Sequence, residues 1–421
     1  MESRLALVFY FPHHKIGGVS ILFLRMAEAL SSEYLVYVAD YSDGYMAKNI
    51  SKNIKLFCID QEYYFPENSI FIFQSFLPWR FPFLEKVKPS SRIFFWNLHP
   101  KNFDPSIFNE KSNFNLFKII SKIVNIFAWK RIIKVKKLIN YLIQNKALEF
   151  MDVENLRSTE EIIGEKLHIN NFLPVATPKL IKRKNFDLVS NEIKLGWVGR
   201  LADFKYRILE HLMHRLSGLN IENKDITLII IGDGDYGDYL KKEAILLSSN
   251  RFKIIFLGEL SPQDLHQYLR ENIDIVFSMG SSALEAASIG LPVFLTDYSY
   301  DKIKKKYKFS LIYEKYGYCL GENIVDESYE NECSLKYSII NILKDYELYS
   351  DLCFKYWETN FSLDSVAISL KNRINSTTAT FGNMKKRGYF EPDKLGLFMR
   401  SAGWWLRNRY SKEITGFRHD C

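Results

Sequence analysis

Strand-like and helix-like segments alternate along this chain in two successive series, and few folds accommodate such an order. The first series has β-branched and aromatic segments at residues 5–11, 35–39, 54–59, 70–74, 92–96 and 147–151. The second series has them at 193–198, 226–231, 253–257, 273–278 and 292–295, with a last one near 310–312. Short apolar strands that alternate with helices form βαβ units and parallel sheets. The sequence therefore predicts an α/β protein with two doubly wound, Rossmann-like domains facing each other across a cleft, where such sheets usually bind ligands.

A basic segment with two prolines, PVATPKLIKR at residues 174–183, separates the two series and is interpreted as an interdomain linker. We therefore expect an N-terminal domain over residues 1–175 and a second domain over 176–350. Residues 351–421 are expected to begin with a helix that runs to residue 370. A basic, aromatic tail follows it, and we expect this last part to cross back to the N-terminal domain.

The composition indicates a folded protein in a reducing compartment. Hydrophobic residues make up 47 % of the chain and charged residues 25 %, as in soluble globular proteins. The five cysteines are scattered and never spaced as CxxC, which argues against a disulfide framework or a zinc site. We identify no signal peptide and no run of about 18 uncharged apolar residues. These features predict a cytoplasmic protein.

The net charge of +8 is concentrated in one segment. Residues 111–146 contain nine Lys or Arg and no Asp or Glu, so the rest of the chain carries a charge of about −1. Within this segment, residues 115–142 mix lysines with Leu, Ile, Phe and Trp129, as amphipathic helices on anionic membranes do. A buried helix pair with a solvated lysine face is the alternative. Because no nucleic-acid-binding motif accompanies the charge, we expect no nucleic-acid partner.

Two cations follow the first strand of the second series. In GWVGRLADFK, at residues 196–205, Arg200 stands at the strand end and Lys205 five residues later. Fixed cations at the carboxyl edge of a parallel sheet suit a diphosphate. They would also stabilise negative charge on a diphosphate leaving group, a task that a divalent metal performs in other enzymes. An ordinary loop with solvated cations is the alternative interpretation.

A glycine-serine turn follows a later strand and opens a helix. The turn holds Gly280, Ser281 and Ser282, and Glu285 lies one helical turn further on. The first N–H groups of such a helix bind anions, and Glu285 could accept hydrogen bonds from the two hydroxyls of a ribose. Alternatively, Ser282 and Glu285 form a capping box, in which the glutamate bonds back to the cap amide.

Together these two motifs resemble the GT-B glycosyltransferases of family 4, the glycosyl transferases group 1. The Arg-x4-Lys pair is similar to the diphosphate clamp of that family, and Gly-Ser-Ser-x2-Glu with the following Gly-Leu-Pro is similar to its ribose-binding segment. The resemblance covers most of residues 193–295 and the first domain more loosely. It implies that Arg200 and Lys205 bind the diphosphate of a nucleoside diphosphate sugar and that Glu285 binds its ribose. It also implies transfer with retention of configuration, with no metal and no cofactor other than the donor substrate.

The sequence departs from the family pattern at two positions. The family often carries a second glutamate eight residues before the one at Glu285, where this chain has Phe277. The glycine that usually follows the clamp lysine is Tyr206 here. The missing glutamate normally contacts the transferred sugar, and we expect backbone amides of residues 280–282 to substitute for it.

In the first domain, Gly17 and Gly18 follow the first strand and open a helix, and His99 follows the fifth. Tandem glycines let a phosphate or sugar approach the backbone, although a tight strand-to-helix turn would also explain them. Their position matches the glycine loop of the family, and His99 resembles the histidine that the family places near the transferred sugar. A histidine before a proline can also be structural.

A second glycine motif competes with this interpretation. Residues 232–237, GDGDYG, form a GxGxxG sequence between a strand and a helix, and Glu259 ends the next strand. Such a motif binds dinucleotides when it follows the first strand of its domain. Here a strand with its own cationic loop precedes it, which disfavours a nicotinamide-dependent oxidoreductase.

The sequence thus predicts a retaining glycosyltransferase that moves a sugar from a nucleoside diphosphate sugar to a saccharide or lipid-linked saccharide acceptor in cell-surface polysaccharide biosynthesis. The basic segment would place it at the inner face of the membrane as a peripheral protein. Three alternatives remain open: a GT-B sugar-nucleotide epimerase, an NAD-dependent oxidoreductase and a non-catalytic sugar-nucleotide-binding protein.

Overall fold

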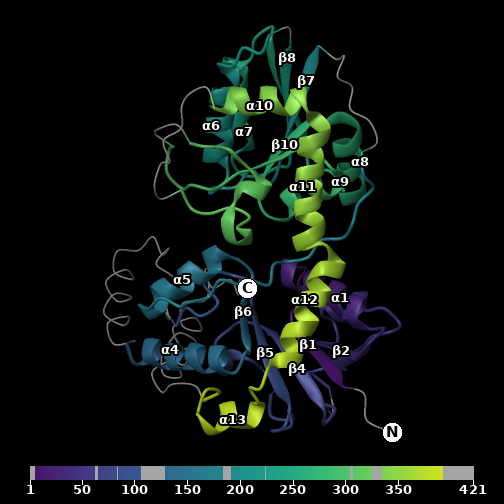
Figure 1. The fold of residues 1–421 in the computed structure, drawn as a ribbon, viewed down its shortest axis with the longest axis vertical. Coiled ribbons are helices and arrows are strands. Elements are labelled where there is room, and N and C mark those ends of the chain that lie inside the picture. Colours follow the sequence, from purple (N-terminus) through teal and green to yellow (C-terminus); the bar gives the residue numbers. More distant parts are fainter. Residues whose placement is uncertain are drawn as a thin grey trace, which may run out of the picture. The chain divides into compact units, whose positions relative to one another are not determined.

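The computed structural model describes residues 5–61, 65–82, 84–105, 129–183, 191–222, 224–303, 307–324 and 334–391. The chain divides into two compact units (Figure 1). The first comprises residues 1–151, 155–169 and 370–421, and the second comprises residues 152–154 and 170–369. The aromatic tail at 404–410 and residues 115–128 of the basic segment lie outside the described residues.

The first unit is built on a sheet of parallel strands in the order β3-β2-β1-β4-β5-β6. These strands are β1 (Ala6–Tyr10), β2 (Leu35–Asp40), β3 (Lys55–Cys58), β4 (Ser69–Gln74), β5 (Arg92–Asn97) and β6 (Leu148–Phe150). In Figure 1, α4 and α5 lie on one side of this sheet, and α1 and the end of α12 lie on the other. The helices of this unit are α1 (Gly18–Leu30), α2 (Tyr45–Asn49), α4 (Trp129–Gln144), α5 (Val153–Ile163), the end of α12 (Leu363–Ser376) and α13 (Phe381–Lys386).

The second unit repeats this plan, with strands in the order β12-β11-β10-β7-β8-β9. They are β7 (Glu192–Val198), β8 (Asp225–Ile231), β9 (Phe252–Gly258), β10 (Ile275–Ser278), β11 (Val293–Leu295) and β12 (Ser310–Leu311). All pair in parallel except β12, which runs antiparallel to β11. The helices of this unit are α6 (Tyr206–Ser217), α7 (Gly237–Leu247), α8 (Pro262–Asn272), α9 (Ser281–Ile289), α10 (Ser334–Lys344) and α11 (Tyr346–Phe361).

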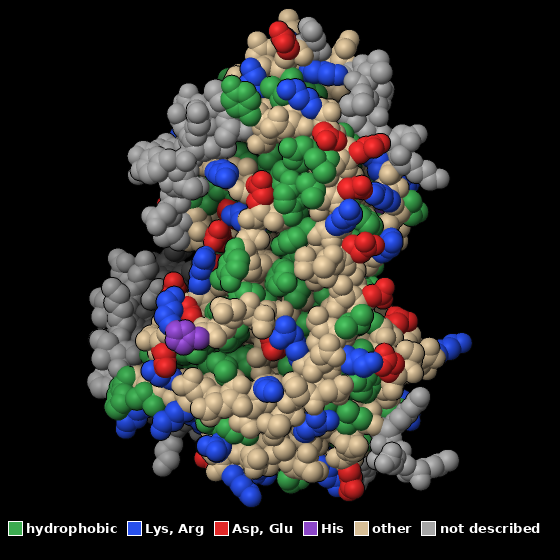
Figure 2. All heavy atoms as spheres, in the orientation of Figure 1, with side chains coloured by type: hydrophobic (Ala, Val, Ile, Leu, Met, Phe, Trp, Pro, Cys, Tyr) green, Lys and Arg blue, Asp and Glu red, His purple; other side chains and the backbone are tan. Residues whose placement is uncertain are grey.

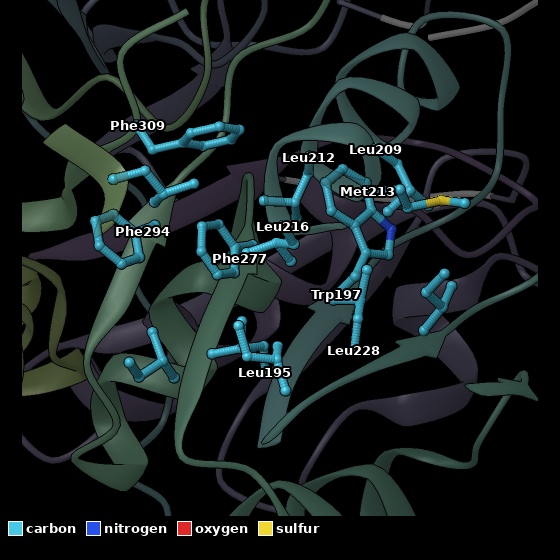
Figure 3. Packing of buried hydrophobic residues seen from close by; sticks show 14 of the residues in the cluster. Leu195, Trp197, Leu209, Leu212, Met213, Leu216, Leu228, Phe277, Phe294 and Phe309 are labelled. Atoms are coloured by element: carbon cyan, nitrogen blue, oxygen red, sulfur yellow. The ribbon is translucent and has the colours of Figure 1, made fainter. Parts of the chain in front are cut away.

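Helices cover both faces of the second sheet, because its strands carry apolar side chains on both sides. One buried cluster joins the sheet to α6, α7 and α10, and includes Trp197, Leu209 and Phe277. Figure 3 shows these side chains gathered under α6. The opposite cluster joins the sheet to α8, α9 and α11, and includes Trp357, whose indole N–H donates to Thr177 Oγ1 at 2.7 Å. Nearly continuous apolar strands are what a parallel sheet buried on two faces requires.

The fold class predicted from the sequence is confirmed. Each strand-like segment of the two series coincides with an observed strand, within one or two residues at most ends. Both sheets have the doubly wound order in which the chain progression reverses between the first and fourth strands of the unit. This reversal lies between β1 and β4 in the first unit and between β7 and β10 in the second. Ligands of such sheets bind at the carboxyl ends of the strands at that point.

Candidate functional site

The predicted clamp loop lies at the reversal point of the second sheet, between β7 and α6. Its backbone is fixed by the neighbouring loop after β8. The N–H of Gly199 donates to Ile231 O at 3.0 Å, and the N–H of Leu201 donates to Asp233 O at 3.0 Å. The loop therefore has one defined path from the end of β7 to the start of α6.

The GxGxxG motif owes its first two glycines to this contact between loops. A Cβ added to Gly232, which has a φ of +134°, would lie 2.2 Å from Gly199 O. A Cβ on Gly234 would lie 2.7 Å from Leu201 O. Only glycine lets the two backbones approach so closely. These glycines thus support the cationic loop, and packing explains them without a dinucleotide.

Arg200 and Lys205 both stand on this loop. Arg200 is exposed and Lys205 is partly buried, with Nζ 5.7 Å from the ring centroid of Phe204. Within the described residues neither side chain forms an ion pair. Burial, and then the positive charge of Arg200, lower the pKa of Lys205 to about 8. Two cations held together without an anion form a site that favours a doubly charged ligand.

The glycine-serine turn lies beside the clamp loop, because β7 and β10 are paired with Val198 opposite Ser278. Ser278 Oγ donates to Val198 O at 2.8 Å, which joins the two strand ends. Gly280 then adopts a φ of +68° as the N-cap of α9, a conformation that favours glycine. Its N–H donates to Leu320 O at 2.7 Å. Across the described part of the chain, the backbone N–H groups of Ser281 and Ser282 have no acceptor.

A buried ionic network fixes the segment that carries Leu320. Asp297 accepts from Lys315 Nζ at 2.7 Å, from Tyr307 Oη at 2.5 Å and from the N–H of Glu322 at 3.0 Å. Burial and the adjacent Asp297 raise the pKa of Tyr307 well above its usual value. Because one carboxylate holds three groups from separate segments, the support of the turn is rigid.

Glu285 contacts His266, a partner that the sequence did not predict. Its Oε2 lies 3.2 Å from Nε2 of His266 on α8, and both side chains are about three-quarters buried, with exposures of 21 % and 24 %. The N-cap of α9 is Gly280, with no side-chain cap hydrogen bond, so the alternative capping box with Ser282 does not form. Sequence reasoning missed His266, because a lone histidine inside a polar helix carries no motif.

Phe277, which occupies the position of the second family glutamate, belongs to the core. Its side chain is fully buried and stacks on Phe294 with ring centroids 4.8 Å apart (Figure 3). It also meets Phe309 edge-on at 5.5 Å. A glutamate here would face apolar rings inside the unit, so this position offers nothing to a ligand at the sheet edge.

In the first unit, Gly17 and Gly18 stand at the start of α1, after β1. Gly17 is the N-cap with a φ of −154°, an extended conformation open to any residue. A Cβ on either glycine would meet nothing within 4 Å. Neither the backbone conformation of Gly17 nor packing at either position therefore requires glycine.

His99 follows β5 on a turn supported by buried polar groups. Its backbone N–H donates to Asn97 Oδ1 at 3.3 Å, and Asn97 Nδ2 donates to Thr159 Oγ1 at 3.4 Å. The N–H of Lys101 donates to Nδ1 of His99 at 3.1 Å, which places the proton of the neutral ring on Nε2. Desolvation, and then Lys101, lower the pKa of His99. The imidazole is therefore neutral at pH 7, with an N–H available as a donor.

The structure thus brings one group of predicted residues together in the second unit, around the ends of two adjacent strands: Arg200, Lys205, Gly280, Ser281 and Ser282, with Glu285 one turn further. Gly17, Gly18 and His99 belong to the first unit. Among the described residues, no three His, Cys, Asp or Glu side chains lie close enough to hold a metal ion. The cations and free N–H groups can hold a diphosphate.

Comparison with known proteins assigns a family to this region. Residues 179–303 match the family described as Glycosyl transferases group 1. The match includes Arg200, Lys205, the turn at 280–282 and Glu285, so the second unit carries a glycosyl transferases group 1 domain. The resemblance stated from the sequence is confirmed at this level. A search of curated proteins gives no match.

Solved structures share the fold over nearly the whole chain. The apo form of WaaB, a lipopolysaccharide outer core galactosyltransferase, has a TM-score of 0.52 and 12 % identity, covering 88 % of this chain and 99 % of its own. A glycosyltransferase from Rickettsia africae has a TM-score of 0.51 and 14 % identity. The match covers 89 % of this chain and 98 % of the Rickettsia protein. The N-terminal domain of trehalose-6-phosphate phosphatase from Candida albicans has a TM-score of 0.52 and 9 % identity. The match covers 89 % of this chain and 97 % of that domain. At these identities the likeness shows the GT-B fold alone, and the site must indicate the reaction.

Proposed function

We propose that this protein is a retaining, family 4-like glycosyltransferase that takes its sugar from a nucleoside diphosphate sugar without a metal ion. One observation carries the proposal: among the residues that the structure describes, Arg200 and Lys205 have no anionic partner, and they stand beside N–H groups of Ser281 and Ser282 that have no acceptor. All of them surround the reversal point of a doubly wound sheet, inside the matched family domain. Such a constellation fits the diphosphate of the donor.

The same groups account for catalysis without a metal. When the bond between sugar and diphosphate breaks, negative charge grows on the leaving phosphate. Preorganised cations and N–H donors stabilise that charge more than they stabilise the ground state. In this proposal Arg200 and Lys205 therefore act mainly on the transition state. The acceptor hydroxyl oxygen bonds to the anomeric carbon on the face from which the diphosphate leaves, and the leaving phosphate takes the hydroxyl proton.

Glu285 is assigned to the ribose. A carboxylate accepts hydrogen bonds only, which suits two neighbouring hydroxyls. His266 occupies one side of Oε2, which fixes the carboxylate and leaves Oε1 for the ribose. As a hydrogen-bond donor, His266 Nε2 would hold the carboxylate of Glu285 in place.

The acceptor is assigned to the first unit, where Gly17 and Gly18 leave space at a helix start and His99 offers an N–H donor. We propose a saccharide or lipid-linked saccharide in cell-surface polysaccharide biosynthesis, in a cytoplasmic protein that associates with the inner face of the membrane. No described helix is long and apolar enough to cross a bilayer.

A thermal-shift panel without metal tests the donor site. UDP, GDP, ADP, CMP and NAD are added to the wild type and to Glu285→Ala. A ligand at about 100 times its Kd stabilises the folded state by about 2.7 kcal/mol, which raises the midpoint measurably. We expect one nucleoside diphosphate to raise it in the wild type and to lose most of that effect in the variant. A shift with NAD alone, or with no ligand, would contradict the proposal.

Turnover assays separate the remaining alternatives. A glycosyltransferase releases nucleoside diphosphate only when a saccharide acceptor is present, apart from slow hydrolysis. An epimerase would isomerise the sugar without an acceptor, and a non-catalytic protein would bind the donor and leave it intact. The packing role of Gly232 and Gly234 leaves the oxidoreductase alternative without its motif.

A further inference from the structure

Three aromatic rings stand beside the clamp lysine and have no part in the donor site described so far. Phe204 meets Tyr298 edge-on with ring centroids 5.8 Å apart, and Tyr300 lies 6.4 Å from Phe204 and 6.1 Å from Tyr298. Tyr300 is half exposed, at 50 %, whereas Phe204 and Tyr298 are partly buried. We refer to Phe204, Tyr298 and Tyr300 as the aromatic trio.

Backbone hydrogen bonds fix the segments that carry Phe204 and Tyr298. The N–H of Ser299 donates to Phe204 O at 3.1 Å, which fastens the loop after β11 to the clamp loop. The N–H of Tyr298 donates to Glu322 O, and the N–H of Ile324 donates to Tyr298 O, both at 2.9 Å. Burial, followed by the charge of Glu154, raises the pKa of Tyr298 to about 12, so it stays a neutral phenol. A surface whose backbone is already fixed loses less conformational entropy when it binds a ligand.

The position of the trio indicates which part of the donor it meets. Phe204 and Tyr298 pack on the buried cluster under α6, whereas Glu285 lies on α9, above the opposite cluster. Glu285 and two rings of the trio, Phe204 and Tyr298, therefore lie over opposite faces of the sheet, and the clamp loop follows the end of β7. A donor whose diphosphate lies on the clamp and whose ribose lies on Glu285 has its sugar at the other end. Phe204 lies on the side away from Glu285, and Lys205 Nζ is 5.7 Å from its ring centroid.

The chemistry of the surface fits a sugar ring. A pyranose has one face of C–H groups, whose partial positive charge is attracted by the electron-rich face of an aromatic ring. The family places a glutamate that contacts the sugar at the position of Phe277, which is a core residue in this chain. Other side chains must therefore contact the sugar here. Aromatic side chains can do so by stacking, without a carboxylate.

We propose that the aromatic trio is the subsite for the transferred sugar, with Tyr300 stacking on the apolar face of the ring. The proposal rests on the proposed donor site, because the clamp sets the position of the sugar. It assigns a new specificity role to the loop after β11, at residues 298–300. Donors whose sugar presents an unbroken C–H face are expected to bind better than donors whose sugar presents hydroxyls on both faces.

A binding experiment that compares nucleotide with sugar nucleotide tests the subsite. Titration calorimetry gives Kd for UDP, GDP and ADP and for UDP-glucose, GDP-mannose and ADP-glucose. In Tyr300→Ala we expect Kd for the sugar nucleotide of the correct base to rise about 3- to 10-fold, from the usual strength of aromatic stacking, while Kd for the free nucleotide stays the same. Tyr300→Phe keeps the ring and should behave like the wild type. Tyr337→Ala, on α10, removes another exposed tyrosine and is the matched control.

The outcomes separate the two proposals. If Tyr300→Ala raises Kd for the nucleotide and for the sugar nucleotide equally, or changes neither Kd, the trio is not the sugar subsite. The proposed donor site is unaffected by that result. If Tyr300→Phe is as weak as Tyr300→Ala, the phenol hydroxyl rather than the ring binds, and the stacking proposal is wrong. If the wild type binds no nucleoside diphosphate, the donor site itself fails and the subsite falls with it.

Discussion

The ammonium group of Lys205 lies among buried atoms beside Arg200, without an ion-pair partner in the part of the chain that the structure describes. Taking a cation out of water without an opposite charge is unfavourable, and this is why its pKa falls to about 8. A bound diphosphate would supply the missing negative charge. Protonation of this one group and donor binding are therefore linked.

Donor affinity should fall as pH rises through the pKa of Lys205. The protonated form binds the diphosphate, and in the free protein this form is lost above a pH of about 8. Between pH 7 and 9.5 we expect Kd for the nucleoside diphosphate to rise in the wild type. Lys205→Arg keeps its charge throughout this range, because an arginine pKa exceeds about 12, and should give a flat profile. Calorimetry over the pH series checks this, and equal slopes in the two proteins would contradict it.

Substitutions of Glu285 or His266 should lower the affinity only for ligands that contain a ribose. Removing a hydrogen bond to a charged group costs about 1.5–3 kcal/mol, so Glu285→Ala should weaken nucleoside diphosphate binding about 10- to 100-fold. His266→Ala should cause a smaller loss, and His266→Gln, which keeps a donor, should recover part of it. Inorganic pyrophosphate lacks the ribose and should bind all variants alike. A matching loss for pyrophosphate would mean that the pair merely supports the fold.

Some site residues could be predicted from the sequence and others could not. Arg200, Lys205 and Glu285 stand in motifs with fixed spacing, so they were predicted. His266 and the aromatic trio come from separate segments that only the folded chain brings together. The sequence showed that Phe277 replaces the second family glutamate, and the structure adds that its side chain enters the core.

Among the elements, the strands were predictable and the loops between them were not. Strands buried on both faces are short apolar runs, which the sequence displays directly. The path of a loop depends on partners elsewhere in the chain. The glycines of GDGDYG resemble a dinucleotide motif in sequence, but Gly232 approaches the backbone of Gly199 in the structure. Whether a glycine serves packing or a ligand is decided by what surrounds it.

Two glycine substitutions should therefore have opposite effects. Gly232→Ala forces a Cβ to within 2.2 Å of Gly199 O and must separate the two loops. We expect it to cost about 1–3 kcal/mol of stability and to weaken nucleotide binding with it. Gly18→Ala meets nothing within 4 Å, so stability should be unchanged while transfer activity falls. Calorimetric melting and a transfer assay check the pair, and a stable, fully active Gly232→Ala would refute the packing argument.

Over the whole molecule, two units of the same topology are completed by segments distant in sequence. Helix α12 begins in the second unit and ends in the first, where Arg373 pairs with Glu149 at 2.5 Å. Thr377 Oγ1 then donates to Ile93 O at 2.9 Å, and the N–H of Phe381 donates to Ser91 O at 2.9 Å. The first unit thus includes residues from the end of the described chain.

The surface of the first unit bears on the predicted membrane contact. Within α4, Arg131 is buried, Lys134 donates to Glu391 O and Lys136 pairs with Glu165 at 2.6 Å, so several of its cations serve the fold. An exposed strip remains on the helix, formed by Trp129, Lys130, Ile133 and Lys137. Figure 2 shows hydrophobic and basic side chains together at the lower left, over the outer end of α4. Such a strip suits the headgroup region of an anionic bilayer.

Flotation with vesicles of anionic and of neutral lipid measures this contact on the full chain. We expect binding to anionic vesicles at low salt and release at high salt, because the attraction is electrostatic and screened. A basic residue near such a surface contributes about 1 kcal/mol, so the double variant Lys130→Gln/Lys137→Gln should bind about 10- to 30-fold more weakly. The double variant Lys242→Gln/Lys253→Gln removes two exposed lysines of the second unit and should bind like the wild type. Equal losses in both variants would show that net charge alone is responsible, and a wild type that never floats would remove the membrane from the proposed function while leaving the donor site intact.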